Sequence, residues 1–198
     1  GNSTPSFFND PVIFKALASK GVAGGDLSLY GIAGCQEPVI MGKESANTTN
    51  SWLNLAKILE LTLNGGVSTI SGKRIAPTPA GLGLPENSLG SYDGVKKAFY
   101  AYVEYFLPRM ARAANACAEA LALCPAPFHS AFMGARETGI DMRDTTGRGT
   151  KYNGSGCLIH GMANVADSFS ALKFVEEKGQ QFGFSIQDVL QAVNSNFK

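Results

Sequence analysis

The sequence predicts an α/β protein, because short apolar runs end in loops and are followed by stretches with the spacing of amphipathic helices. The clearest strand-like run covers residues 27–33 and leads into Gly34 and Cys35. The clearest helical stretches cover about residues 50–64 and 93–123, where apolar side chains recur every three or four positions. The predicted strands are too few to close one sheet within the 198 residues.

Turn and capping residues divide the first half of the chain into elements. Asp10 followed by Pro11 predicts the N-cap and the first position of a short helix that ends at Gly21. Glycine and proline mark residues 66–75 as a short hairpin and residues 76–93 as a loop. The helix from about residue 50 has one broad apolar face, which consists of Trp52, Leu55, Ile58, Leu59 and Leu63.

The middle of the chain combines a long helix with irregular connections. Residues 93–123 predict this helix, and Pro108 within it predicts a kink or a break. Residues 124–133 predict an extended or mixed segment, and residues 157–163 predict a buried apolar run.

Two helices are predicted at the end of the chain. Residues 164–178 have amphipathic spacing, with Asn164 as the expected cap. Ser185 and Asp188 form a near capping box that predicts the start of the last helix. We find no internal repeat and no linker that would separate two domains.

The composition excludes several classes of function. The formal net charge is +1, with both signs scattered along the chain, so no surface for nucleic acid or an anionic membrane is expected. No apolar stretch is long enough to cross a bilayer, and the first ten residues lack the features of a signal peptide. We therefore expect a cytoplasmic protein that acts on a small or weakly charged partner.

The spacing of the four cysteines fits neither a zinc site nor a disulfide framework, so reduced thiols and no metal site are expected. Cys117 and Cys124 lie seven positions apart in a helical stretch, and Cys157 lies in an apolar run. These three are interpreted as core residues.

Cys35 is followed two positions later by Glu37, and the pair lies between Gly34 and Pro38. In an extended segment alternate side chains point to the same face, so the thiol and the carboxyl are expected to share one cavity, on a loop after a buried strand. Gly34 and Pro38 would hold the segment extended and let the backbone approach a ligand closely. The pair also fits a structural cysteine beside an unrelated carboxylate.

Ordinary nucleophilic catalysis fits this pair poorly. A nucleophilic cysteine needs a base to form thiolate, and neither His129 nor His160 lies near Cys35 in the sequence. The Glu37 carboxylate would itself disfavour thiolate. A thiol that gives up a hydrogen atom beside a carboxyl that moves a proton is a better match, which indicates radical chemistry.

Six landmarks in order extend this interpretation to nearly the whole chain. They are PSFFND, YGIAGCQEP, NLAKILELTLNGG, PFHSAF, TKYNGSG and GMANVADSFSALK. In this order they resemble the central part of glycyl radical enzymes of the pyruvate formate-lyase superfamily. The eliminase and dehydratase members carry a GCxEP loop, which Cys35 and Glu37 match, whereas formate-lyases proper have adjacent cysteines there.

The resemblance implies that the fold is a partial segment of a ten-stranded barrel with surrounding helices. Residues 1–198 would be the central part of a pyruvate formate-lyase-like catalytic domain. The C-terminal glycyl radical domain is expected to be absent from this chain, because no RVxGY-like phrase occurs in it. The segment alone is therefore expected to be inactive and to expose a large apolar surface.

The resemblance also implies the chemistry. Cys35 would carry the thiyl radical, and Glu37 would act as general base and acid while water, an amine or sulfite leaves a small 1,2-substituted alcohol. No cofactor is expected to bind this segment. The complete enzyme would hold a glycyl radical, installed by an activating enzyme that uses S-adenosylmethionine and an iron–sulfur cluster. Further expected partners are the remainder of the enzyme with its glycyl loop, a small-molecule substrate and a second copy in a homodimer.

Two alternatives stay open at this stage. A glycyl radical decarboxylase or C–C lyase uses a closely related thiyl cysteine, and the CxE pattern also occurs in arylacetate decarboxylases. The alternative of another class is a non-catalytic fragment or scaffold domain descended from such an enzyme. A partner that carries the glycyl loop would discriminate between an enzyme and a scaffold.

Overall fold

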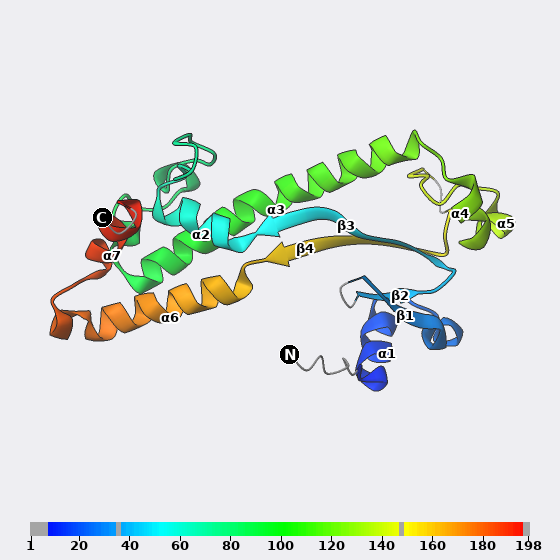
Figure 1. The fold of residues 1–198 in the computed structure, drawn as a ribbon, viewed down its shortest axis with the longest axis horizontal. Coiled ribbons are helices and arrows are strands. Elements are labelled where there is room, and N and C mark those ends of the chain that lie inside the picture. The colour runs from blue at the N-terminus through cyan, green and yellow to red at the C-terminus, as the bar shows by residue number, and fades with distance from the viewer. Residues whose placement is uncertain (1–7, 35–36, 147–148, 196–198) are drawn as a thin grey trace, which may run out of the picture. The chain divides into compact units, whose positions relative to one another are not determined.

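The computed structural model describes residues 8–34, 37–146 and 149–195 (Figure 1). The chain divides into two compact units, each formed by two separate stretches. The first unit consists of Gly1–Asn50 and Ala114–Cys157, and the second unit consists of Ser51–Ala113 and Leu158–Lys198. No linker marks these boundaries in the sequence, because two strands and one long helix run from one unit into the other.

The first unit begins with a helix, a 3-10 turn and a β-hairpin. Asn9 caps the helix with its side chain, which accepts a hydrogen bond from the Val12 backbone N–H at 3.4 Å. The prediction of Asp10 as the cap is therefore wrong, because Asp10 already lies in the first helical turn together with Pro11. The elements are α1 (Asp10–Ser19), the 3-10 turn (Gly24–Leu29), β1 (Tyr30–Ala33) and β2 (Glu37–Ile40).

The predicted strand at residues 27–33 exists only from Tyr30 onward, because the 3-10 turn includes residues 27–29. β1 pairs with β2 in antiparallel register, with Tyr30 opposite Ile40 and Ala33 opposite Glu37. The prediction that this strand is buried is wrong for the chain by itself, since no residue of β1 is fully buried.

The remaining helices of the first unit are α4 (Pro127–Phe132) and α5 (Ala135–Thr138). The sequence predicts an extended or mixed segment at α4, but Pro127 is compatible with the first turn of a helix. The Asp141 carboxylate supports this turn by accepting hydrogen bonds from the Ala126 N–H and the Ser130 hydroxyl, both at 2.8 Å.

Two long strands, β3 (Glu44–Asn54) and β4 (Tyr152–His160), pair in a two-stranded sheet. Figure 1 shows their arrows pointing the same way, with the long helix α3 (Tyr92–Ala122) in the connection between them. Parallel strands need a crossover of this kind, because the end of the first strand and the start of the second lie at opposite ends of the sheet. This arrangement confirms the predicted α/β organisation.

The helix predicted from about residue 50 begins only at Leu55, as α2 (Leu55–Leu63). The Asn54 side chain caps it by accepting a hydrogen bond from the Lys57 N–H at 3.0 Å. Trp52 therefore lies in β3 and is 61% exposed, whereas its neighbour Leu53 is only 6% exposed. Alternate burial of this kind is typical of a strand, so the assignment of Trp52 to a helical face is wrong.

Helix α3 continues through Pro108, so of the predicted kink or break the break is wrong, and the kink stays a prediction. Proline removes only one backbone donor, and the strongly helical sequence on both sides maintains the helix. The predicted hairpin at residues 66–75 is confirmed by an antiparallel bridge between Val67 and Arg74.

Helix α6 (Met162–Lys178) is capped by Gly161 and not by the predicted Asn164. Gly161 has a φ of +76°, and a Cβ atom at this position would lie 2.8 Å from the Cβ of Ala56. Only glycine fits where β4 ends and α6 begins against α2, and this tertiary contact moves the start of the helix.

The core of the second unit consists of two apolar clusters. Helix α7 (Ile186–Asn194) joins one of them, and its predicted capping box of Ser185 and Asp188 is confirmed. The first cluster contains Leu53, Ile58, Leu59, Ala76, Phe99, Tyr102 and Val165. The second contains Val95, Leu172, Val175, Ile186 and Leu190.

Several side chains that the sequence assigns to a core are exposed. Cys117, Cys124 and Cys157 are free thiols on the surface, so their interpretation as core residues is wrong for the chain by itself. Large apolar side chains are exposed as expected, among them Ile70, Leu123, Phe128 and Phe132. Within the described ranges, no helix has the length and apolar character needed to cross a membrane.

Candidate functional site

Of the predicted catalytic pair, the structure describes Glu37, at the start of β2. Because Ala33 pairs with Glu37, residues 34–36 form the connection between the strands. Gly34 has a φ of +48°, so the chain turns at this residue, and the prediction of an extended conformation is wrong there. Glu37 is the first residue of β2, whereas Cys35 lies outside the described residues. A common cavity for the thiol and the carboxyl therefore stays a prediction.

The Glu37 carboxylate is the chemically distinctive group of this hairpin. Its Oε2 atom is buried and has no hydrogen-bond partner among the described residues. Burying a carboxylate oxygen without a donor is unfavourable, so such groups in proteins usually meet a ligand, a neighbouring segment or a proton. The arrangement leaves this oxygen available as a proton acceptor or as an acceptor for a substrate hydroxyl.

Contacts at the open end of the hairpin, where Tyr30 pairs with Ile40, hold it in place. The Tyr30 hydroxyl donates a hydrogen bond to the Asp10 carboxylate of α1, and its ring packs edge-on against Phe14 with ring centroids 5.7 Å apart. Ile40 is fully buried, and its backbone N–H donates to the Glu44 carboxylate at 2.8 Å. Glu37 therefore projects from a strand whose position is fixed by its neighbours.

The sequence does not predict the buried carboxylate of Asp26, which lies in the 3-10 turn just before the hairpin. Asp26 is 6% exposed and accepts hydrogen bonds from Lys43 and Lys151, both at 2.5 Å, and from the Tyr152 hydroxyl at 2.7 Å. The hydrogen bond from Lys151, followed by those from Lys43 and Tyr152, lowers the pKa of Asp26 well below its usual range. This cluster connects the 3-10 turn to the segment after β2 and to the start of β4. No local motif indicates it, because its partners are distant in the sequence.

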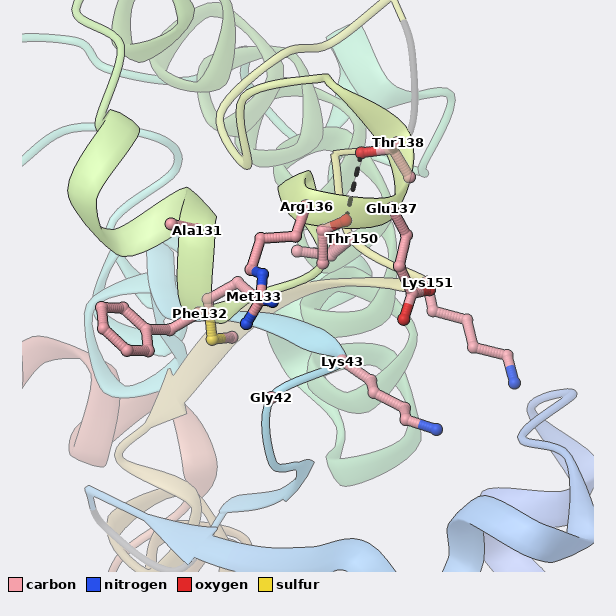
Figure 2. Close-up of a pocket in the computed structure, with 11 residues that line it drawn as sticks. Gly42, Lys43, Ala131, Phe132, Met133, Arg136, Glu137, Thr138, Thr150 and Lys151 are labelled. Carbon is pink, nitrogen blue, oxygen red and sulfur yellow. Dashed lines mark hydrogen bonds between the residues drawn. The ribbon is translucent and has the colours of Figure 1, made fainter.

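A cavity of about 770 Å³ lies beside this cluster (Figure 2). Figure 2 shows the ammonium groups of Lys43 and Lys151 extending away from the guanidinium of Arg136, and both lysines bind Asp26. Glu37 is not among the described residues that line this cavity. The lining residues are Gly42, Lys43, Ala131, Phe132, Met133, Gly134, Arg136, Glu137, Thr138, Thr150 and Lys151.

Neither histidine bonds to the buried oxygen of Glu37. His129 lies in α4 beside the ring of Phe128, and His160 stacks on Trp52 with ring centroids 4.5 Å apart and planes at 12°. In the part of the chain that the structure describes, no three His, Cys, Asp or Glu side chains gather as a metal site. Among the described residues, the candidate site therefore consists of the β1–β2 hairpin and the Glu37 carboxylate.

Comparison with known proteins agrees with the order of landmarks in the sequence. The family model described as "Pyruvate formate lyase-like" matches residues 1–198. The chain belongs to this family. The relatives described next place it in the dehydratase-like branch of the glycyl radical enzymes, as the sequence predicts.

Two curated relatives are dehydratases. The (2S)-3-sulfopropanediol dehydratase of Klebsiella oxytoca is 31% identical over 201 residues, which cover 100% of this chain and 23% of the relative. The trans-4-hydroxy-L-proline dehydratase of Clostridioides difficile is 31% identical over 204 residues, which cover 100% of this chain and 24% of the relative.

A solved structure extends the similarity to the fold. The glycerol-bound B12-independent glycerol dehydratase from Clostridium butyricum matches with a TM-score of 0.81 and 33% identity, over 98% of this chain and 24% of that chain. The chain thus spans about a quarter of the length of the relatives it matches. The predicted fold, a partial region of a glycyl radical enzyme with mixed helices and strands, is confirmed.

Proposed function

We propose that this chain is the thiyl-bearing segment of a glycyl radical lyase that eliminates water from a small 1,2-substituted alcohol. Family membership and the dehydratase activity named for its relatives support this assignment. The observation that carries it to residues of this chain is the buried Glu37 oxygen without a hydrogen-bond donor, two positions after Cys35. An elimination needs such a proton acceptor next to the hydrogen-abstracting thiol.

Cys35 and Glu37 divide the reaction between a hydrogen atom and a proton. In the complete enzyme a glycyl radical would supply the oxidising equivalent that converts the Cys35 thiol to a thiyl. The Cys35 thiyl takes the hydrogen atom from the substrate carbon that bears the first hydroxyl. Glu37 then accepts the proton of that hydroxyl, which gives a substrate ketyl radical anion.

The remaining steps return both groups to their starting state. The ketyl expels the neighbouring hydroxyl as hydroxide, and Glu37 returns its proton to form water. The carbonyl compound is left with a radical on the adjacent carbon, and this carbon takes back the hydrogen atom from the Cys35 thiol. The net change converts a 1,2-diol into a carbonyl compound and water, with the thiyl regenerated.

The partners of this segment follow from the same proposal. The rest of the enzyme would supply the glycyl loop, and a separate activating enzyme with S-adenosylmethionine and an iron–sulfur cluster would install the radical. The complete enzyme would act in the cytoplasm as a homodimer. Leaving groups other than water, namely an amine or sulfite, require the same two residues of this chain.

The test is a pair of substitutions in the full-length enzyme, activated without oxygen. Cys35→Ser should abolish turnover while the glycyl radical signal persists, because the serine O–H bond is too strong for that radical to break usefully. Glu37→Gln should lower turnover by roughly 10²–10⁴-fold while hydrogen exchange into the substrate continues. Cys117→Ser, at an exposed thiol of the same unit, is the matched control and should have full activity.

Other outcomes point to the alternatives. Full activity of the Cys35 variant would contradict the thiyl assignment. If only the Glu37 variant keeps full activity, a mechanism without this base, such as C–C cleavage, replaces elimination. If the full-length protein accepts no radical from any activating enzyme tested, a scaffold without catalysis is the better assignment.

A further inference from the structure

We propose that Gly34 is a positioning residue whose missing side chain leaves the space in which the Glu37 carboxylate is held, an inference that rests on the proposed function. A Cβ atom added to Gly34 would lie 3.0 Å from Glu37 Oε2 and 3.7 Å from both Glu37 Cδ and Oε1. The carboxylate therefore lies beside the space that a side chain at position 34 would occupy.

The pairing of the strands makes this contact specific. Ala33 and Glu37 are opposite each other in the antiparallel register, so the backbone of Glu37 is fixed relative to the end of β1. The backbone of Glu37 cannot withdraw without opening the last pair of the hairpin, so only the side chain can yield. An added methyl group would therefore change the direction in which the carboxylate points.

The same contact explains why the effect falls on the carboxylate and not on the fold. A 3.0 Å approach to a Cβ atom is too close, and the atom that must move is at the far end of a flexible side chain. Its displacement by a few tenths of an ångström costs little stability. Proton transfer is much more sensitive, because a misplacement of about 1 Å can cost on the order of 10²-fold in rate.

The buried state of Oε2 strengthens this interpretation. The described part of the chain offers Oε2 no hydrogen-bond donor that could fix its direction, so steric contacts have a larger share in positioning it. The contact with Gly34 is one such constraint on the carboxylate. Gly34 also has a φ of +48°, a conformation that alanine rarely adopts and asparagine tolerates better.

The experiment compares three variants in the full-length, anaerobically activated enzyme. Gly34→Ala and Gly34→Asn both add a Cβ atom, but Gly34→Asn strains the backbone less. Gly42→Ala is the matched control, because Gly42 has a φ of +69° just after β2 and a Cβ atom there would meet only an ordinary 3.7 Å contact. We expect kcat to fall about tenfold in both Gly34 variants, with the Gly42 variant close to the unsubstituted enzyme.

Two readouts separate a displaced base from general damage. The glycyl radical signal and the uptake of solvent deuterium into the substrate, which requires only hydrogen transfer through Cys35, should persist in both Gly34 variants. Gly34→Ala should also cause no further loss of kcat in an enzyme that already carries Glu37→Gln, because the base is then absent.

The possible failures are distinguishable. If Glu37→Gln is nearly inactive but both Gly34 variants have normal kcat, the role of Gly34 is refuted and the proposed function stands. An equal loss from Gly34→Ala with and without Glu37→Gln also refutes it, because the effect then comes through the backbone. Failure of both Gly34 variants to fold, with Gly42→Ala folded, would make Gly34 a hairpin residue only. Full activity of Glu37→Gln would instead overturn the proposed function.

Discussion

The two units of the chain are stabilised by different interactions. The second unit buries two apolar clusters, with Tyr102 and Val95 fully inaccessible to solvent. The described residues of the first unit bury few apolar side chains, mainly Leu17 and Ile40, and place Asp26 and Ser130 in buried hydrogen-bonded positions. The unit that carries the β1–β2 hairpin is thus held largely by polar contacts with specific geometry.

This difference has consequences for how each unit responds to change. Apolar burial is non-directional and depends little on pH, so the second unit should respond mainly to loss of volume. A network of ionised groups depends on charge and on the position of each donor, so the first unit should respond to neutralisation and to acid. The predictions below test this comparison.

The largest effect is expected for Phe99→Ala in the second unit. Phe99 is 6% exposed and packs edge-on against Phe169 with ring centroids 5.5 Å apart. The free energy of unfolding should fall by about 3–5 kcal/mol, because the substitution leaves a cavity. Urea denaturation followed by amide hydrogen exchange in α2 and α3 measures this loss.

The neighbouring residue provides the control for this prediction. Tyr100 is 55% exposed, so Tyr100→Ala should change the free energy of unfolding by no more than about 0.5 kcal/mol. Equal losses for the two variants would mean that apolar burial does not dominate the second unit.

A smaller and more local effect is expected for Asp26→Asn in the first unit. The variant keeps the shape of the side chain but removes the charge that binds Lys43 and Lys151. Amide hydrogen exchange in residues 24–43 should become several-fold faster, while the second unit stays unchanged. Glu137→Gln is the control, because Glu137 is an exposed carboxylate of the same unit.

Acid should have the same effect on the unsubstituted protein. The pKa of Asp26 is lowered in the folded state, so its stabilisation is fully present above the ordinary pKa of about 4 and is lost as the pH falls through the lowered value. The Asp26→Asn variant should lack this acid-dependent part. If amide exchange in residues 24–43 becomes faster with acid to the same extent in Asp26→Asn and in the unsubstituted protein, other carboxylates control the acid response.

The smallest effect is expected for Ser185→Ala at the start of α7. The Ser185 hydroxyl and the Asp188 carboxylate cap this helix, so the loss should be about 1 kcal/mol and confined to the second unit. Exchange of the first amides of α7 measures it. Ser170→Ala is the matched control, because the Ser170 hydroxyl only donates to the Ala166 carbonyl within α6 and its removal should cost nothing. An equal loss for Ser170→Ala would contradict the capping argument.

The sequence alone determined what depends on short-range contacts and on motif order. The capping box of α7, the extent of α3 and the GCxEP pattern depend on residues within a few positions of each other, so local spacing predicted them. The family followed from six landmarks in order, and the match over residues 1–198 agrees with it. The roles of Cys35 and Glu37 stay predictions from the same motif.

Only the tertiary structure decided where distant segments impose a conformation. Residues 50–54 have helical spacing but lie in β3, a strand that pairs with the distant β4. Asp26 is buried by lysines 17 and 125 positions away, which no local pattern records. The contact between Gly34 and the Glu37 carboxylate depends on the register of the hairpin. For β3 and for Asp26 the deciding energy comes from a partner that is distant in the sequence, and local propensity is too weak to oppose it.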